Sequence, residues 1–259
     1  MLEFSLKNGA LFKSTFACFV NEVSDCLLHF DQNGMRVQAM DSSHVSMVML
    51  NFIASEMFNE YKCTEPTSLG VSVKSLMTVL KLSDKKTTVT LIQNEPNNSK
   101  LTIGIVSDDK KINFLFDLNL MDIETDELTV PDNLVGWKVV VDFTDITSVT
   151  KNMSEFGDSM SLCFGTSTNN ELLYQVEGDT GTVTGKIIVQ SAEWSDTSTA
   201  PNDAVSMKVS MRYLKNYLAC RDISDKVELL MGNDIPLCVS YRLSEQSVLG
   251  FFIAPKMEE

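Results

Sequence analysis

Few residues of this chain could carry chemistry, and the first group of them is Asp41-Ser42-Ser43-His44. The group contains the residue types of a hydrolase triad, in which a serine attacks a carbonyl and a histidine accepts its proton. Triad groups must converge in space, whereas neighbours along a strand point to opposite faces. No G-x-S-x-G elbow surrounds either serine, and the only other histidine is His29. A hydrolase using Ser42 or Ser43 is therefore kept only as an alternative, and we predict that the chain is not an enzyme.

The segment Gly181–Lys186, with sequence GTVTGK, resembles a phosphate-binding loop but does not complete one. It is one residue shorter than G-x-x-x-x-G-K-[ST], and Ile187 stands where the loop requires Ser or Thr. A turn followed by an edge strand is expected over 178–185 instead. The six cysteines include no CxxC pair, and the acidic residues show no metal-ligand grouping. The sequence therefore predicts no metal and no cofactor.

The composition limits the remaining possibilities. With 259 residues, of which 44% are apolar, the chain could form one large domain or two of ordinary size. The net charge of −14 argues against a protein that coats nucleic acid with its whole surface, and it predicts repulsion from anionic membranes. No apolar run approaches the roughly 18–20 residues of a membrane span, and no signal peptide is visible. We expect an intracellular protein without a membrane partner.

The charge is sorted along the chain. Four helix-like windows contain Lys or Arg but no Asp or Glu, although the chain holds 35 acidic residues. These windows are 10–21, 71–82, 146–154 and 207–221. An ordinary solvated helix face usually mixes signs, because Glu–Lys pairs four residues apart stabilise helices. Clustered cations in an acidic chain instead predict contact with a polyanion, through phosphates and without base reading.

The basic residues of these windows tend to follow an apolar residue of the buried stripe, as Lys74 follows Val73. One residue is a step of about 100° around a helix, so such side chains face outward beside the core. The windows also contain Lys208. The residues predicted to contact phosphates are Lys13, Lys74, Lys81, Lys151, Arg212, Lys215 and Arg221.

The chain also repeats itself weakly. Residues 73–80 fall over 211–218 at an offset of 138 residues, and nearer the start of each half the offset falls to about 133. Each half then has the order helix, strands, helix, strands. This predicts an α+β fold of two similar domains, mostly antiparallel sheet with two helices per domain. The expected strands are 35–40, 45–52, 87–92, 101–106, 112–118, 138–141, 182–189, 226–231 and 237–243.

An acidic segment, 119–133, lies between the halves and ends soon after Val130-Pro131. Such a segment is typical of an exposed linker, with a long hairpin loop as the alternative. The predicted organisation is an N-terminal domain over 1–118, a connecting linker over 119–135 and a C-terminal domain over 136–259.

Several motifs, in order along the chain, carry a resemblance to a known family. They are Met40 to Val45, Leu120 to Pro131, Arg212-Tyr213-Leu214, Asp234 to Leu237 and Ile253 to Lys256. On these motifs the chain resembles the proliferating cell nuclear antigen type of DNA sliding clamp over essentially its full length. The resemblance implies a homotrimeric ring of six similar domains, with helices lining a central hole that encloses duplex DNA. Such a clamp is a processivity factor that tethers DNA polymerase and other replication and repair proteins. It works in the nucleus, or at the intracellular site of replication if viral.

The resemblance also implies a partner site, a hydrophobic pocket beneath the linker. Polymerase, the clamp loader and other partners would insert short hydrophobic peptides there. The matching residues here are Met40, Asp41, His44, Val45, Met47, Leu128, Val130, Pro131, Pro236, Phe252, Ile253, Ala254, Pro255 and Lys256. Subunits would join through edge strands near 111–117 of one chain and 177–185 of the next.

The chain departs from the family pattern at some of these positions. Residues that are often basic or His in the family are here Val20, Thr78, Ser148, Glu155 and Ala219, which predicts a weaker DNA-facing potential. Thr166 stands where many members have a lysine that accepts ubiquitin-type modification. A subunit of a specialised, checkpoint-type heteromeric clamp is the alternative function.

Overall fold

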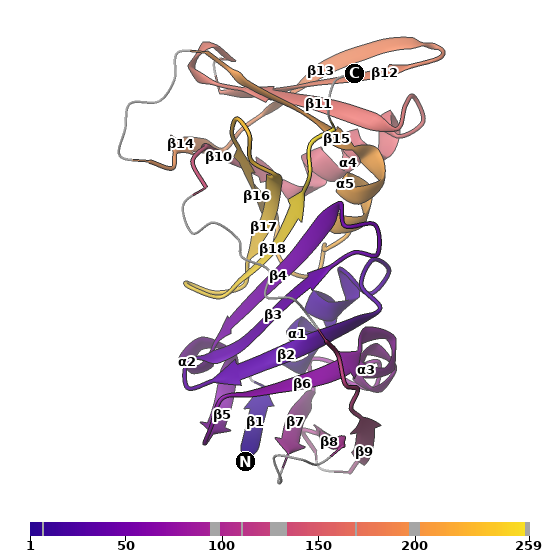
Figure 1. Ribbon diagram of the computed structural model, residues 1–259, viewed down its shortest axis with the longest axis vertical. Coiled ribbons are helices and arrows are strands. Elements are labelled where there is room, and N and C mark those ends of the chain that lie inside the picture. Colours follow the sequence, from indigo (N-terminus) through magenta and orange to yellow (C-terminus); the bar gives the residue numbers. More distant parts are fainter. Residues whose placement is uncertain are drawn as a thin grey trace. The chain divides into compact units, whose positions relative to one another are not determined.

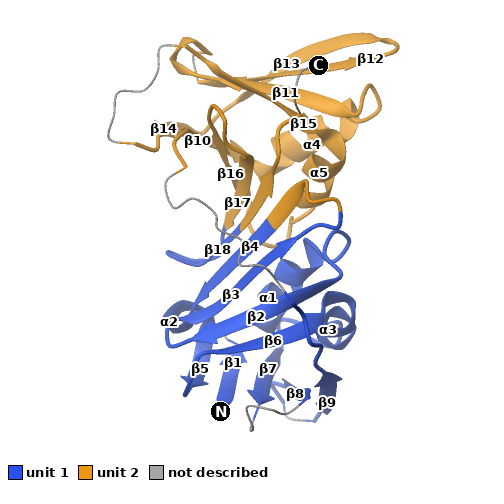
Figure 2. Cartoon of the chain, in the orientation of Figure 1, with its two compact units in different colours: residues 1–42, 48–128, 242–249 blue, residues 43–47, 129–241, 250–259 orange. Residues whose placement is uncertain are grey.

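The computed structural model describes residues 1–6, 8–93, 99–109, 111–124, 134–168, 170–196 and 203–256. Its contacts divide the chain into two compact units, coloured separately in Figure 2, and Figure 1 labels the helices and strands. Unit 1 comprises 1–42, 48–128 and 242–249, and unit 2 comprises 43–47, 129–241 and 250–259. The predicted α+β class with mostly antiparallel sheet is confirmed.

Unit 1 is built on two antiparallel layers of strands and carries two principal helices. One layer has the order β5-β1-β7-β8-β9, and in the other β6 pairs with β2 and β2 with β3, next to β4. Helices α1 and α3 contact each other, and α2 is an additional single turn. The bounds are β1 Leu2–Leu6, α1 Gly9–Ala17, β2 Asp25–Asp31, β3 Gly34–Met40, β4 Ser46–Ile53, α2 Ala54–Met57, β5 Phe58–Cys63, β6 Thr67–Ser72, α3 Val73–Leu80, β7 Thr87–Gln93, β8 Lys100–Ser107 and β9 Asn113–Asn119.

Unit 2 repeats this plan. Its strands form the orders β14-β10-β16-β17 and β13-β12-β11-β15, and helices α4 and α5 contact each other. The bounds are β10 Trp137–Asp142, α4 Phe143–Met153, β11 Ser159–Phe164, a 3-10 turn Thr166–Thr168, β12 Glu171–Gly178, β13 Gly181–Ile188, β14 Ser191–Trp194, β15 Val205–Ser210, α5 Met211–Tyr217, β16 Lys226–Met231, β17 Leu237–Arg242 and β18 Val248–Ile253.

The helices form where the sequence places an apolar stripe at helical spacing. In α3 the stripe of Val73, Leu76 and Leu80 is completely buried, as the pattern predicts. Helix α1 begins after Asn8, whose Oδ1 accepts the Leu11 amide at 3.0 Å. The inner faces of both helices are therefore fixed by core packing, which leaves their other faces for charge.

Helix α5 is shorter than the predicted window. The prediction of helix from residue 207 was wrong, because 205–210 form strand β15 and the helix begins only at Met211. In β15 the side chains of Val205, Met207 and Val209 are buried in strict alternation, which is the period of a strand. Met207 and Met211 are also four residues apart, so the same residues satisfied both patterns.

Helix α4 is longer than its window and begins at Phe143 rather than near residue 146. Its first turn therefore includes the exposed Asp145, an acidic residue outside the window. Of the helices in the predicted windows, α1, α3 and α5 contain no acidic residue within their observed bounds, whereas α4 contains one.

The start of the predicted linker is attached to unit 1. The Met121 amide donates to the Gly70 carbonyl at 2.8 Å, and a Cβ on Gly70 would come within 2.1 Å of the Met121 carbonyl oxygen. Only glycine permits this close approach. The rest of the segment, 125–133, lies outside the described residues, and so do the predicted pocket residues Leu128, Val130 and Pro131.

The expected turn and edge strand near 178–185 are confirmed. Strand β12 ends at Gly178, β13 begins at Gly181, and β13 stands at the end of its sheet order. The GTVTGK segment therefore lies in an edge strand rather than a phosphate-binding loop. In the described part of the chain, the search for membrane spans found no helix with the length and hydropathy that crossing would need.

Candidate nucleic-acid and peptide interfaces

The predicted phosphate contacts of unit 1 lie on α1 and α3. Lys74 is exposed in the first turn of α3, and Lys81 is exposed at its C-cap. Lys13 differs from both, because it is half-buried and its Nζ donates to the Ser83 carbonyl oxygen at 2.6 Å. Lys74 and Lys81 are thus exposed to a ligand, whereas Lys13 is hydrogen-bonded within unit 1.

The predicted phosphate contacts of unit 2 lie on or next to α4 and α5. Lys151 is exposed in the last turn of α4, and Arg212 and Lys215 are exposed on α5. The Arg212 guanidinium lies 5.3 Å from the centroid of the Tyr213 ring, a cation–π distance. Arg221 is exposed beyond the end of α5.

Lys208 lies on a different surface from these cations. It is half-buried in β15 and points away from the buried face formed by Met207 and Val209. Its carbonyl oxygen accepts the Lys256 amide at 2.7 Å. The strand assignment therefore removes Lys208 from the helix surface to which the sequence pattern had assigned it.

The internal repeat places cations at equivalent positions. Lys74 is the second residue of α3, Arg212 is the second residue of α5, and each follows a buried apolar residue. An exposed ammonium or guanidinium on a helix without acidic residues can bind the phosphate groups of nucleic acid. Such contacts do not depend on the base sequence. The exposed Asp145 of α4 is the counterexample on these helices.

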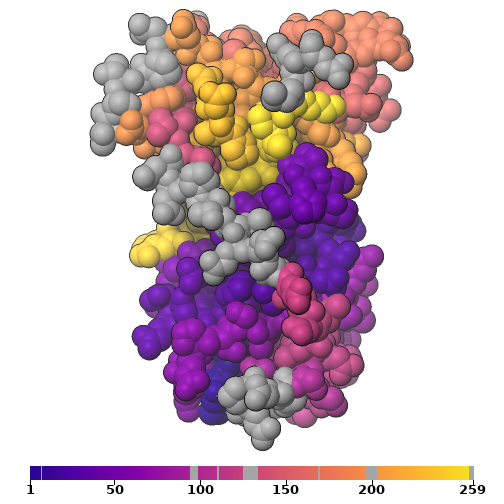
Figure 3. Space-filling view, viewed as in Figure 1, coloured from indigo at the N-terminus to yellow at the C-terminus, as the bar shows by residue number. Residues whose placement is uncertain are grey.

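The predicted peptide site of unit 2 includes an exposed C-terminal tail, residues 254–256. The described chain ends there at the surface, in yellow in Figure 3. The Ala254 amide donates to the Val45 carbonyl at 2.9 Å, and the Lys256 Nζ donates to the Ser159 Oγ at 2.7 Å. His44 is exposed and has a φ of 56°, in the left-handed region that few non-glycine residues occupy.

Other predicted pocket residues lie mainly in the core. Ile253 is fully buried, Phe252 is 7% exposed and Met47 is 9% exposed, all in unit 2, and in unit 1 Asp41 is 2% exposed. Their side chains support the surface rather than form it. Among the remaining members, Met40 of unit 1 is 38% exposed, and Val45 and Pro236 of unit 2 are half-buried.

A buried hydrogen bond attaches the 43–47 segment to Tyr217 within unit 2, and two further contacts fix Tyr217 in turn. The Ser46 Oγ lies 2.5 Å from the Tyr217 Oη, and the Tyr217 ring stacks on Phe251 with centroids 4.2 Å apart. The Tyr241 hydroxyl donates to the Tyr217 carbonyl at 2.8 Å. The sequence offered no signal for this anchor, because its members are far apart along the chain.

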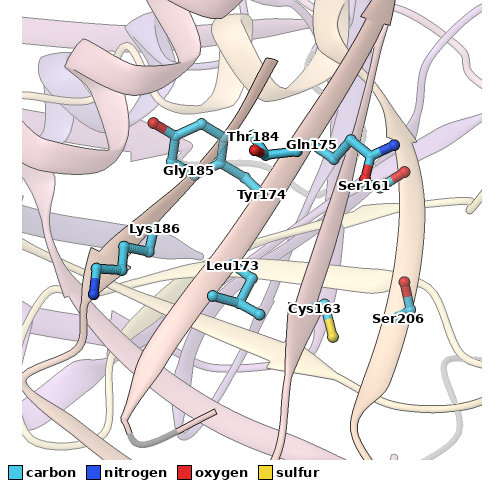
Figure 4. A pocket seen from close by; sticks show the side chains of 9 residues that line it. All are labelled: Ser161, Cys163, Leu173, Tyr174, Gln175, Thr184, Gly185, Lys186 and Ser206. Atoms are coloured by element: carbon cyan, nitrogen blue, oxygen red, sulfur yellow. The ribbon is translucent and has the colours of Figure 1, made fainter. Parts of the chain in front are cut away.

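A separate cavity of about 560 Å³ lies on the sheet face formed by β11, β12, β13 and β15 (Figure 4). Its lining includes Cys163, Leu173 and Lys186, and Lys186 is paired with Glu171 at 2.6 Å. Desolvation raises the pKa of the Cys163 thiol, which keeps it protonated and weakly nucleophilic near neutral pH. This cavity was not predicted, and its residues offer no activated nucleophile.

The four residues Asp41-Ser42-Ser43-His44 do not share one environment. Asp41 is buried, whereas Ser42, Ser43 and His44 are exposed. A search of the described residues finds no group of three or more His, Cys, Asp or Glu residues that could hold a metal ion.

Strand β9 is an exposed edge with apolar side chains on both faces. Phe114 and Phe116 are 43% and 46% exposed, and Leu115, which points the other way, is 74% exposed. Ile112 just before the strand is 54% exposed. Open edges of this kind promote pairing with another strand, and soluble proteins normally cover or charge them.

Comparison with known proteins finds relatives of both halves of the chain. A family model described as "Proliferating cell nuclear antigen, N-terminal domain" matches residues 1–128, and one described as "Proliferating cell nuclear antigen, C-terminal domain" matches residues 131–256. A similar curated protein is "Proliferating cell nuclear antigen 2" of Drosophila melanogaster, 26% identical over 259 residues. The alignment covers 100% of this chain and 99% of that relative.

Proposed function

Since the chain belongs to the proliferating cell nuclear antigen family, we propose that it is a DNA sliding clamp, a ring that encircles duplex DNA during replication. The clamp acts as a processivity factor and a scaffold, not as an enzyme. It tethers DNA polymerase and other replication and repair proteins and is opened onto DNA by a clamp loader. Its site of action is the nucleus, or the intracellular site of replication if the source is viral.

The observation that carries the DNA-binding proposal is the repeated pair of exposed cations Lys74 and Arg212. They are the second residues of α3 and α5, helices that lack acidic residues and occupy equivalent places in the two units. Phosphate contact through such residues is independent of sequence and weakens with salt. Topological enclosure would then supply retention on DNA while the contacts themselves stay weak enough for sliding.

The ring is proposed to be a homotrimer. Its subunits would join by pairing the exposed edge strand β9 of one chain with β13 of the next, which covers the apolar residues of β9. A closed ring of identical subunits leaves no β9 edge open. A heteromeric clamp would instead need other chains before it could close.

The peptide-binding proposal rests on the exposed tail and on His44 and Val45. Clients would place an apolar and aromatic plug against this surface and hydrogen-bond to the tail backbone. Binding to a ring held on DNA raises the effective concentration of a client at the template without any increase in its intrinsic affinity. Short hydrophobic peptides of the polymerase and the loader are therefore the expected partners.

Charge reversal tests the DNA-facing assignment. Lys81→Glu and Arg212→Glu should each weaken binding to a short fluorescent duplex at low ionic strength, with the circular dichroism spectrum unchanged. Lys62→Glu is the matched control, because Lys62 is an exposed lysine on β5, outside the predicted helices. Equal affinities for Lys81→Glu, Arg212→Glu and Lys62→Glu would show that the two helices do not face DNA.

A further inference from the structure

Lys13 makes a contact that a phosphate-binding lysine does not need. Its Nζ donates to the Ser83 carbonyl oxygen at 2.6 Å, and its side chain is half-buried. The bond joins the middle of α1 to the loop that follows α3, 70 residues further along the chain. The ammonium group therefore has a partner within unit 1.

Ser83 is itself fixed in that loop. It is 1% exposed, its Oγ donates to the Leu80 carbonyl at 2.7 Å, and the Gly9 carbonyl oxygen lies 3.5 Å from the same Oγ. The start of α1 and the end of α3 thus meet around one buried serine. Lys13 supplies the only positive charge among these contacts.

The end of α3 is a favourable place for that charge. The amides of Lys81, Leu82 and Ser83 donate back to carbonyls of the last helical turn, at 3.0 to 3.1 Å. The carbonyl end of a helix carries partial negative charge, which a nearby ammonium stabilises. The Lys13 ammonium therefore holds the turn that carries Lys81.

Lys81 is the exposed side chain presented by this turn. It is the C-cap residue of α3, and Leu82 after it is 47% exposed. The side chain of Lys81 is exposed and its main chain is part of the turn, so the direction of the side chain follows the backbone of the turn. That backbone is attached to α1 through Ser83 and Lys13.

The described part of unit 2 shows a different arrangement at the matching place. The fifth residue of α1 is Lys13, whereas the fifth residue of α4 is Thr147. The Thr147 Oγ1 donates to the Phe143 carbonyl at 2.6 Å, within its own helix. The side-chain bond from Lys13 to the loop after α3 in unit 1 is thus not reproduced by Thr147 in unit 2.

We propose that Lys13 is a positioning residue, which orients Lys81 toward phosphate by holding the end of α3 and does not itself contact DNA. This role rests on the proposed function, because it presupposes that Lys81 meets the DNA backbone. It changes the part assigned to Lys13 by the charge pattern of the sequence. The Lys13 ammonium binds within unit 1 and thereby places the Lys81 ammonium at the surface.

A double-mutant cycle tests the proposal. Lys13→Met should weaken duplex binding by roughly two- to fivefold, the range for one surface charge contact. In a Lys81→Met background the same Lys13→Met change should have no further effect, because it acts through Lys81. Lys13→Arg keeps a donor for the Ser83 carbonyl and should restore most of the affinity. The measurement is fluorescence anisotropy of a short labelled duplex at low ionic strength.

Amide hydrogen exchange supplies the structural readout. Exchange at Lys81, Leu82 and Ser83 should accelerate in Lys13→Met and stay unchanged in Lys81→Met. Additive losses of affinity, or an unchanged affinity in Lys13→Met beside a loss in Lys81→Met, would overturn the positioning role. A Lys81→Met protein that binds DNA normally would instead remove the proposed DNA face, and the role of Lys13 with it. Accelerated exchange in Lys13→Met would then still establish the bond.

Discussion

The Ala254 amide donates a hydrogen bond of 2.9 Å to the Val45 carbonyl oxygen. Lys256 donates its amide to the Lys208 carbonyl at 2.7 Å, and Pro255 between them has no amide hydrogen. The tail therefore uses its amide donors within unit 2. A client peptide that pairs with it must present donors of its own to the tail carbonyls.

The first prediction concerns the side chain of Ala254. Ala254→Asp keeps the amide bond to Val45 but places a carboxylate on the exposed tail. Covering that charge with an apolar plug costs more than about 1.4 kcal/mol, so affinity should fall at least about tenfold. Fluorescence titration with a labelled peptide that carries aliphatic and aromatic residues measures the loss.

Ala219→Asp is the control for this substitution. Ala219 is an exposed alanine of the same unit, just beyond α5. It should leave peptide affinity unchanged. Equal peptide affinity for the Ala254→Asp and Ala219→Asp proteins would place the peptide site elsewhere.

The sequence predicted the elements whose patterns are local. Every strand that it predicted is present, and helix α3 begins at Val73 as α5 begins at Met211, at the offset of 138 residues seen in the repeat. A further set of strands went unpredicted. Among them is β5, whose residues are mostly exposed and lack a continuous apolar pattern.

The residues of the candidate sites also divide into those with a local sequence pattern and those without one. Exposure of Lys74, Lys81 and Arg212 followed from the position of each beside an apolar stripe. The burial of Ile253 was not predicted from the sequence. Because Ile253 is buried, substituting it should affect stability as well as peptide binding. Removing this fully buried side chain would destabilise unit 2 by about 2–5 kcal/mol, so weaker peptide binding in such a variant would not identify a contact. The bond between Lys13 and Ser83 depends on tertiary packing, which a single sequence does not encode in any local pattern.

The second prediction concerns the buried pair of Ser46 and Tyr217, whose oxygens are 2.5 Å apart. Tyr217→Phe removes one hydroxyl but keeps the stack on Phe251, and it should lower the free energy of unfolding by about 1 kcal/mol. Ser46→Ala should cost a similar amount. The double variant should cost less than the sum, because one shared bond is lost once. Urea denaturation followed by circular dichroism measures all three, and strict additivity would mean that the two hydroxyls do not interact.

The third prediction is a pH dependence that originates at Glu56. Hydrogen bonds from Ser244 and Ser247, together with the Gln246 amide at 3.1 Å, lower the pKa of this carboxyl below its ordinary value. A lowered pKa means stability that is present above the pKa of the unfolded chain and is lost as pH falls through that of the folded protein. Glu56→Gln should therefore be less stable than the natural protein at neutral pH.

The difference between the two proteins should shrink as the solution becomes more acidic and disappear once Glu56 is protonated in the folded state. Urea midpoints measured across the acidic range follow it. Glu60→Gln is a suitable control, because Glu60 is exposed on β5. A difference that persists unchanged into acid would assign the effect of Glu56→Gln to shape rather than charge.

The fourth prediction concerns assembly through β9. Leu115 is 74% exposed, so Leu115→Glu should change the free energy of unfolding of the single chain by less than about 0.5 kcal/mol. In the proposed trimer this side chain lies at the joint between subunits, where an unpaired carboxylate is costly. Light scattering should show the mass of the variant shifted from trimer toward monomer. Leu173→Glu, on β12 and 37% exposed, is the control and should remain trimeric. A Leu115→Glu protein that keeps the trimeric mass would show that β9 is not the joint, and the apolar residues of its edge would then need another cover.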